Sequence, residues 1–457
     1  MLMAHHEETI VAQCTPAGSG ALGIIRLSGK NAISVADNIA LLASKKKLSA
    51  LPSHTIHYGS IVYDDILIDH VLFLLMHGPQ TFTGQNTVEI TCHNNPFIIE
   101  SIINSAIKAG ARIAQNGEFT QRAVINNKID LLQAEAINEL IHANTQIALK
   151  QSLAQLDGSF SQWIYRIEKQ LIKALALSEA SFEFIDEENM EFGVQINGII
   201  EETNNTITTL KKIYDAQKQI REGVRIALIG TVNAGKSSLF NTLLNQDRSI
   251  VTNTAGTTRD VIEAGIYEKG NYWTIIDTAG IRQSNDSIEK EGVARSYQEA
   301  KKADIILLIM DGSRDLSKSE KEVYLDIYNS YHTKTILIQS KSDLSQKIIS
   351  PFQALAIKTS HGNQESVISI KKAIQSKIEA LFCSIESPFL LNQRQVKLLE
   401  SLSQKLKNIG QLLHGDISYE IISHHLTDAI SSLSELTGKS ITEAGMDAVF
   451  RDFCIGK

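Results

Sequence analysis

The spacing of apolar and polar residues divides the chain into four segments. Residues 1–126 contain short apolar and β-branched runs typical of strands, and Asp64-Asp65 between two of these runs predicts a hairpin turn. Residues 127–221 place apolar side chains at helical spacing, without a strand-like run. Between residues 222 and 383, fully apolar runs alternate with helical spacing, as expected for buried parallel strands. Residues 384–457 return to helical spacing.

This order predicts a multidomain protein of mixed α/β and α class. Because helical segments flank the α/β segment on both sides, we predict that residues 222–383 are inserted into one discontinuous helical domain, formed by 127–221 and 384–457. The first segment, residues 1–126, is expected to form an α+β domain. A chain of 457 residues is long enough for about three domains.

The stretch Val224–Ser238, with the sequence VRIALIGTVNAGKSS, predicts a phosphate-binding loop. A β-branched run ends at Gly230, and the loop then spells GxxxxGKS before a helix that we expect to begin at Ser238. Glycines let successive backbone N–H groups face one anion, the lysine neutralises phosphate charge, and the serine hydroxyl can bind magnesium. A glycine turn in another kind of α/β unit is the alternative. The predicted nucleotide-binding residues of this loop are Asn233, Ala234, Gly235, Lys236, Ser237 and Ser238.

Two further motifs extend this site towards magnesium and the terminal phosphate. The motif DTAG follows a predicted strand, so its carboxylate can hold magnesium through water and its glycine N–H can reach the phosphate. A DxxG pattern alone is weak, but its position one strand after a phosphate loop strengthens it. The motif GTTRD supplies Thr258 as a second hydroxyl ligand for magnesium beside Ser237, and an ordinary surface loop is the alternative. The DTAG residues are Asp277, Thr278, Ala279 and Gly280.

The motif SKSD, Ser340–Asp343, predicts selection of guanine. The Asp343 carboxylate can accept two N–H bonds from the guanine edge, and adenine lacks these donors. Lys341 completes the motif, but the usual asparagine is replaced by Ser340, which we expect to lose one amide contact to the base and to the phosphate loop. We therefore predict a retained guanine preference with weakened affinity. A final nucleotide-binding turn is expected at Ala356–Lys358, through its backbone N–H.

Composition narrows the class of protein and its partners. A net charge of -7 gives no general attraction for nucleic acid, so an RNA partner requires a local basic patch. Every apolar run is shorter than the roughly eighteen residues of a membrane span, and the start MLMAHHEETI lacks a secretory signal pattern. The four cysteines form no CxxC pair, which argues against zinc and against a disulfide framework. We expect a cytoplasmic protein without a membrane partner.

Four sequence blocks outside the nucleotide motifs resemble one family, the tRNA modification GTPases called MnmE or TrmE. They are GIIRLSG (Gly23–Gly29), GEFTQRA (Gly117–Ala123), NKIDLLQAEA (Asn127–Ala136) and the terminal CIGK (Cys454–Lys457). Together with the nucleotide motifs, the resemblance covers nearly the whole chain. It implies an N-terminal tetrahydrofolate-binding and dimerisation domain, a discontinuous helical domain and an inserted Ras-like GTPase domain.

For GTP hydrolysis, the resemblance implies a mechanism that uses potassium. Ile281 after DTAG cannot polarise water. In the family a glutamate orients the water, and the matching residue here is Glu289. Without the resemblance, Glu289 would be interpreted as a solvated surface residue. The family holds potassium with a phosphate-loop asparagine, here Asn233, whose alternative role is a bond that stabilises the loop. A monovalent cation there would offset charge on the phosphates, beside the catalytic Lys236. The facing residues implied for potassium and nucleotide are Thr252, Thr254 and Thr257.

For the N-terminal domain, the resemblance implies binding of a formyl- or methylene-tetrahydrofolate. The folate contacts that it carries over are Arg26, Glu89, Lys128 and the terminal Lys457. A carboxylate suits the N–H donors of the pterin, and cations suit the glutamate tail, although each residue alone reads as a surface charge. The chain departs from the family pattern at Gln85-Asn86 and Asn94-Asn95, so the resemblance does not fix the affinity of this chain for folate. Cys454 is implied as a nucleophile or redox group, and a small buried apolar residue is the alternative.

The implied function is modification of the wobble uridine of certain tRNAs, by adding an aminomethyl or carboxymethylaminomethyl group at carbon five. The implied partners are a second copy of the chain, tRNA, and MnmG with its FAD; the implied cofactors are GTP, Mg²⁺, K⁺ and the folate. Two other functions stay open: a ribosome-assembly GTPase and a GTP-responsive scaffold. Ribosome-assembly relatives carry an RNA-binding domain after the GTPase, whereas this chain continues as helices and reaches CIGK.

Overall fold

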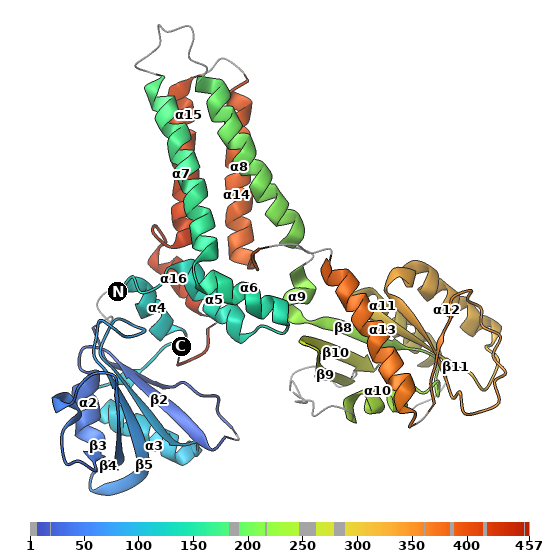
Figure 1. Cartoon of the computed structure of the whole chain (residues 1–457), viewed down its shortest axis with the longest axis horizontal. Helices are drawn as coiled ribbons and strands as arrows, with labels where there is room; N and C mark the ends of the chain where they lie inside the picture. The colour runs from blue at the N-terminus through green and yellow to red at the C-terminus, as the bar shows by residue number, and fades with distance from the viewer. Residues whose placement is uncertain are drawn as a thin grey trace. The chain divides into compact units, whose positions relative to one another are not determined.

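The computed structural model describes residues 7–18, 20–181, 192–214, 217–245, 262–277, 288–360, 362–383, 388–414, 418–451 and 453–456 (Figure 1). The chain forms two compact units. Unit 1 comprises Met1–Asn138, Ala154–Asn205 and Lys397–Lys457, and unit 2 comprises Glu139–Leu153 and Thr206–Val396. The domain boundaries that the sequence suggests after residues 126, 221 and 383 remain predictions.

The N-terminal part of unit 1 is a seven-stranded sheet in the order β3-β4-β5-β6-β2-β1-β7. Neighbouring strands are antiparallel, except that β1 and β7 are parallel. The strands are β1 (Ile10–Gln13), β2 (Leu22–Ser28), β3 (Ala40–Leu42), β4 (Thr55–Tyr63), β5 (Ile66–Met76), β6 (Thr87–His93) and β7 (Arg112–Ile113). Helices α2 (Ala32–Ile39) and α3 (Pro96–Lys108) and the 3-10 helix η1 (Leu48–Ala50) pack on one face of this sheet.

Alternation along the strands decides which side chains these helices cover. In β5, Val71, Phe73 and Leu75 are buried in the shared core with α2 and α3. Leu72, which lies between them, is 43% exposed because successive side chains of a strand point to opposite faces. The predicted hairpin turn at Asp64-Asp65 is confirmed, since both residues have positive φ between β4 and β5.

Helices α7 (Ser159–Ala180) and α15 (Tyr419–Thr437) lie side by side in unit 1, although they are far apart in the sequence (Figure 1). The Ser178 hydroxyl of α7 donates a hydrogen bond of 3.0 Å to the Tyr419 carbonyl of α15. The other helices with residues in unit 1 are α4 (Glu118–Ile125), α5 (Leu131–Ile141), α6 (Gln146–Leu156), α8 (Phe192–Tyr214), α14 (Gln393–Leu412) and α16 (Glu443–Phe450). Within the described ranges, no helix combines the length and apolarity needed to cross a bilayer.

Unit 2 contains a six-stranded sheet in the order β13-β12-β11-β8-β10-β9. All neighbours are parallel except β9 and β10. The strands are β8 (Val224–Ile229), β9 (Ile262–Glu268), β10 (Asn271–Asp277), β11 (Ile305–Asp311), β12 (Thr335–Ser340) and β13 (Ile357–Lys358). The helices that lie wholly in unit 2 are α9 (Lys218–Glu222), α10 (Lys236–Asn245), α11 (Ile288–Lys302), α12 (Lys318–Tyr331), the 3-10 helix η3 (His332–Lys334) and α13 (Gln364–Cys383).

The prediction of buried parallel strands is confirmed in this sheet. Every residue of β11 is buried, because helices cover both of its faces. Helices α10 and α13 pack on one face, and α11 and α12 pack on the other. The carboxyl ends of the parallel strands β8, β10, β11 and β12 therefore meet at one edge, where ligands of such sheets bind.

A buried arginine connects α4 to the N-terminal sheet. Arg122 Nη1 donates hydrogen bonds to the Glu8 carbonyl at 2.7 Å and to Gln85 Oε1 at 2.9 Å. Its Nη2 donates to Glu118 Oε1 at 2.9 Å, and Glu118 also accepts two bonds from Arg112. Burial raises the pKa of Glu118, but the bonds from Arg112 and the charge of Arg122 outweigh it, so that the net pKa is lowered. The carboxylate is therefore charged at neutral pH.

We predict that Arg122→Met lowers the unfolding free energy of this domain by about 3 kcal/mol, because a buried carboxylate loses one of its two cation partners. Native-state hydrogen exchange of the β1 and β2 amides measures the change. The control, Arg166→Met, alters an exposed arginine of α7 and should change the same free energy by less than about 0.5 kcal/mol. Equal protection in the two variants would contradict a structural role for Arg122.

Candidate functional site

Strand β8 carries the predicted phosphate loop to the carboxyl edge of the unit 2 sheet. The strand is buried and ends at Ile229, and the loop starts at Gly230. A Cβ atom at Gly230 would collide with the Ile309 carbonyl of β11, so only glycine allows the two backbones to approach this closely. Helix α10 begins at Lys236, two residues before the start at Ser238 that the sequence suggested.

The Lys236 side chain folds back over its own loop. Its Nζ donates hydrogen bonds of 2.7 Å to the carbonyls of Gly230 and Thr231. The residue is 6% exposed, and burial lowers the pKa of Lys236 while the charge of Asp277 partly opposes this shift. The ammonium thus lies inside the loop that curls around phosphates in sites of this kind. The sequence motif does not single out Thr231, because its contribution is a backbone carbonyl.

Ser237 and Asp277, two of the groups that the sequence assigns to magnesium, lie together at the carboxyl edge of the sheet. The Ser237 hydroxyl donates a hydrogen bond of 2.8 Å to Asp277 Oδ2. This pair forms because β8 and β10 are parallel neighbours, so that the residue ending β10 faces the loop that leaves β8. A hydroxyl and a carboxylate are hard oxygen ligands, and the pair therefore fits a magnesium ion that keeps several of its waters.

The middle of the phosphate loop is a tight turn that exposes Asn233. Asn233 has a φ of +62°, a left-handed conformation that asparagine tolerates better than most residues. The Ala234 N–H donates to the Thr231 carbonyl at 3.2 Å, which closes the turn. The Asn233 side chain is exposed, so it is open to a ligand rather than bound into the core.

Ser340 corrects one expectation from the sequence. Its hydroxyl lies 2.6 Å from the Ala234 carbonyl and 3.1 Å from the Met310 carbonyl, and the residue is 6% exposed. The expected loss of contact with the phosphate loop is therefore wrong, because the serine at the end of β12 is close enough to bond to the loop directly. The expected loss of a contact to the base remains a prediction.

The rest of the guanine motif follows β12 at the same edge. Lys341 pairs with Asp311 at 2.6 Å, and Asp343 is exposed. The turn expected at Ala356–Lys358 is wrong, since Ile357–Lys358 form the edge strand β13 and pair with β12. Thr359 continues this pairing, since its N–H donates to the Gln339 carbonyl and its carbonyl accepts from the Ser342 N–H. Pairing with β12 thus overrides the local preference for a turn.

Several predicted site residues lie outside the described residues. These are Thr252, Thr254, Thr257, Thr258, Thr278, Ala279, Gly280 and the terminal Lys457. Glu289 is the second residue of α11, and only its backbone is described. Ser238 is exposed in the first turn of α10, next to Ser237. The roles assigned to these residues remain predictions.

Two of the predicted folate residues form an ion pair on the N-terminal sheet. Arg26 of β2 and Glu89 of β6 are directly opposite each other, and their side chains are 2.7 Å apart. The Arg26 guanidinium lies 5.5 Å from the ring centroid of Phe119. Lys128 is exposed, and its stem lies near Gly84. The side chains of Arg26 and Glu89 are 22% and 17% exposed, so the ion pair is accessible to a ligand.

The residues that depart from the family pattern have structural contacts in this chain. Gln85 accepts a bond from Arg122, and Asn86 accepts one from the Gly78 N–H at 3.0 Å. Asn94 accepts a bond of 3.2 Å from Gln13, and Asn95 caps α3 by accepting from the Phe97 N–H. Neutral amides thus take up hydrogen bonds that hold the ends of β6 and the start of α3.

The C-terminal CIGK segment lies against the start of the N-terminal sheet. The Gly117 N–H donates to the Cys454 carbonyl at 3.3 Å, and Asn116 forms a β-bridge with Ile455. The thiol of Cys14, at the end of β1, donates to the Gly456 carbonyl at 3.0 Å. Cys454 itself is exposed, which contradicts its alternative role as a small buried residue. No sequence pattern singles out Cys14, because its partner is a backbone carbonyl at the other end of the chain.

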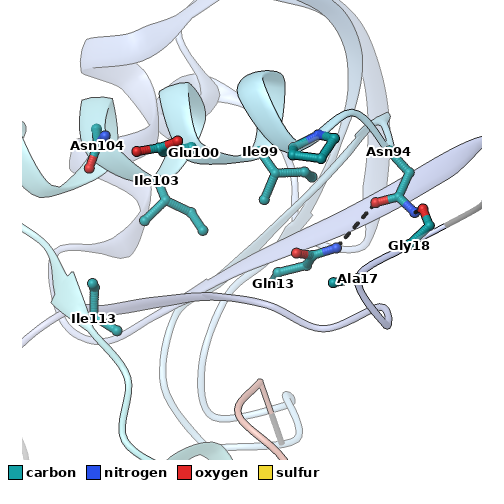
Figure 2. A pocket seen from close by; sticks show the side chains of 10 residues that line it. Gln13, Ala17, Gly18, Asn94, Ile99, Glu100, Ile103, Asn104 and Ile113 are labelled. Carbon is teal, nitrogen blue, oxygen red and sulfur yellow. Dashed lines mark hydrogen bonds between the residues drawn. The ribbon is translucent and has the colours of Figure 1, made fainter. Parts of the chain in front are cut away.

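A pocket of about 380 Å³ lies between β1 and α3 in the N-terminal part of unit 1 (Figure 2). Gln13 and Asn94 line one side, and Ile99, Glu100 and Ile103 of α3 line the other. The predicted folate residues Arg26, Glu89 and Lys128 are absent from its lining. In β1, Gln13 pairs with Ile25, the neighbour of Arg26, and alternation therefore places the side chains of Gln13 and of the Arg26–Glu89 pair on opposite faces of the sheet.

Comparison with known proteins identifies the family. The family model described as the MnmE helical domain matches residues 131–454, and the model described as the GTP-binding protein TrmE N-terminus matches residues 9–128. The chain belongs to the MnmE family of tRNA modification GTPases. The tRNA modification GTPase MnmE of Bacillus subtilis is 35% identical over 466 residues, which cover 98% of this chain and 100% of that protein. The MnmE of Streptococcus thermophilus is 36% identical over 465 residues and covers 98% of each chain.

The family resemblance, the fold class and the prediction of a GTP hydrolase are thereby confirmed. Among solved structures, the G domain of the T. maritima FeoB iron transporter aligns with 34% of this chain and 98% of its own at 27% identity. Its TM-score of 0.27 is too low to support a structural argument. Membership of the MnmE family instead rests on sequence identity that extends over both units.

We predict that the chain prefers GTP to ATP and that Ser340→Asn tightens GTP binding about fivefold, the effect of one added hydrogen bond. Calorimetric titration with GTP and with ATP measures both. Ser340→Ala should instead weaken GTP binding by a similar factor, because the Ala234 carbonyl loses its partner. Equal affinity of the native chain for ATP and GTP would refute the role of Asp343.

Proposed function

We propose that the chain couples GTP hydrolysis to modification of the wobble uridine of certain tRNAs in the cytoplasm, together with MnmG and its FAD. The product would carry an aminomethyl or carboxymethylaminomethyl group at carbon five of the base. The observation that carries this proposal is the phosphate loop, with Lys236 and the Ser237–Asp277 pair, in a chain of the MnmE family. GTP hydrolysis would drive the rearrangement that assembles the joint site with MnmG.

In the proposed reaction, the chain's own groups position the triphosphate and stabilise its charge. Lys236 would keep its contacts with the Gly230 and Thr231 carbonyls and turn its third N–H towards the phosphate oxygens, and the α10 N-terminus would add its dipole. Ser237 and Thr258 would hold magnesium, which neutralises charge on the phosphates when bound. Glu289 would orient the attacking water, because Ile281 has no polar group for that task.

Potassium is proposed as the second cation of the site. The exposed, left-handed Asn233 supports this assignment, because its side-chain carbonyl is free to face a ligand next to the phosphates. Thr252, Thr254 and Thr257 would complete the set from the facing loop. A monovalent cation at this position would offset charge that develops during hydrolysis, as an arginine does in other GTPases.

The N-terminal domain is proposed to bind a tetrahydrofolate derivative as the one-carbon donor. The Arg26–Glu89 pair supports this, since a carboxylate beside a guanidinium can bind the N–H groups and carbonyl of a pterin. Lys128 and Lys457 would bind the glutamate tail. The exposed Cys454, held next to the sheet by the Gly117 and Cys14 contacts, is proposed as the reactive thiol.

The second face of the N-terminal sheet supports a homodimer. Ile56, Tyr58 and Leu72 of β4 and β5 are 64%, 56% and 43% exposed, and Tyr58 and Leu72 are directly opposite each other. Adjacent exposed apolar side chains of this size mark interaction surfaces, and we propose that a second copy of the chain covers them. Two GTPase domains would then meet when potassium and GTP are present.

We predict that GTP hydrolysis is about tenfold faster in potassium chloride than in sodium chloride, because sodium is too small for a site built for potassium. Phosphate release at equal ionic strength measures the rates. Asn233→Ala should lose this preference, whereas Asn205→Ala, which alters an exposed residue of α8, should keep it. Identical rates in the two salts would exclude the potassium site.

We also predict that deletion of residues 454–457 leaves GTP hydrolysis within about twofold of the native rate, because the nucleotide site lies in unit 2. The same deletion should abolish the tRNA modification. Mass analysis of tRNA nucleosides, from cells that carry the deletion or lack the gene, measures the modified uridine. Normal modification without the gene would refute the proposed function.

A further inference from the structure

Thr231, the first residue after Gly230, connects the phosphate loop to helix α12. Its N–H donates a hydrogen bond of 2.9 Å to the Tyr324 hydroxyl, and its carbonyl accepts the 2.7 Å bond from Lys236. Its own hydroxyl lies 3.3 Å from Arg314 Nη2. One residue thus joins the phosphate-binding lysine to two side chains that belong to no nucleotide motif.

The Tyr324 hydroxyl bridges two backbone segments. It donates to the Ile309 carbonyl of β11 at 2.6 Å while it accepts from Thr231. Tyr324 is 3% exposed, and its ring packs in the core between the sheet, α11 and α12. Burial raises the pKa of Tyr324, so the phenol keeps the proton that it donates. Both bonds lie away from water, where an unpaired N–H or carbonyl is costly.

Arg314 forms the second part of the connection. Its two Nη atoms bind both oxygens of Glu320 at 2.9 and 2.7 Å, which fixes the guanidinium beside Thr231. Glu320 is itself held by the capping box with Ser317 at the start of α12. Its pKa is lowered to about 2 chiefly by the bonds from Arg314, so this fork persists at neutral pH.

We propose that Tyr324, assisted by Arg314, is a positioning residue that holds Thr231 so that Lys236 is aimed at the β and γ phosphates of GTP. Tyr324 does not touch the nucleotide in this proposal; it acts through the Thr231 backbone. Helix α12 thereby becomes the element that sets the geometry of the phosphate loop. This proposal rests on the proposed binding of GTP at the phosphate loop. The affinity of the native chain for GTP is measured in the same experiment.

The test replaces the hydroxyl and keeps the ring. Tyr324→Phe leaves the Thr231 N–H and the Ile309 carbonyl without that partner, and we expect affinity for GTP and GDP to fall about tenfold. Affinity for GMP should change by less than about twofold, because GMP lacks the phosphates that this lysine reaches. Competition of GTP, GDP and GMP against a fluorescent GDP measures all three. A variant with a merely loosened domain would lose GMP affinity in the same proportion.

The matched control is Tyr328→Phe, one turn later on α12, where the ring packs on Phe352 at 4.7 Å between centroids. It should bind all three nucleotides as the native chain does. Arg314→Gln alters a side chain that is 42% exposed. It should reduce the affinity for GDP about threefold and leave the affinity for GMP unchanged. This variant still tests the proposal if Tyr324→Phe misfolds. Unchanged GDP affinity in Tyr324→Phe or Arg314→Gln, or an equal loss of GDP and GMP, would overturn the proposal. Absence of GTP binding in the native chain would instead refute the GTP site itself.

Discussion

The structure of unit 2 depends on one close approach, that of the Gly230 backbone to the end of β11. This approach places the Gly230 and Thr231 carbonyls where they can accept the Lys236 ammonium. A buried ammonium is tolerated only when its charge and its N–H groups have partners. The Gly230 and Thr231 carbonyls are such partners when no phosphate is bound, so the loop keeps its shape around the lysine. Strand β8, the start of α10 and the bridging Tyr324 are all arranged around this contact.

In unit 1, the corresponding constraint is the alternation of side chains across the N-terminal sheet. One face is closed by α2 and α3, while the other carries the Arg26–Glu89 pair and an open apolar area. The pocket beside α3 and the ion pair are therefore separate features, although β1, β2 and β6, which carry Gln13, Arg26 and Glu89, are neighbouring strands. The C-terminal segment returns to the end of β1 and places Cys454 beside this sheet.

At two positions where the chain departs from the usual motif, its own residues form hydrogen bonds. Ser340 reaches the phosphate loop with a hydroxyl in place of an amide, because β12 ends within 2.6 Å of the Ala234 carbonyl. Gln85 accepts from a buried arginine whose charge is already balanced by Glu118. A neutral acceptor is sufficient there, since a second buried carboxylate would add a desolvation cost. Each of the two side chains is therefore held by a hydrogen bond in this chain.

The sequence by itself determined the fold class, the buried parallel strands of unit 2, the family and the GTP hydrolase activity, because periodicity and short motifs are local properties of the chain. It also placed the hairpin at Asp64-Asp65 correctly, since the turn depends on its own backbone. It misplaced the turn at Ala356–Lys358, where pairing with β12 overrides local preference. Only the tertiary structure decided the contacts of Thr231 with Tyr324, of Ser340 with Ala234, and of Cys14 with Gly456. Each of these pairs a side chain with a backbone group distant in sequence, and backbone groups carry no residue signature that a sequence could reveal.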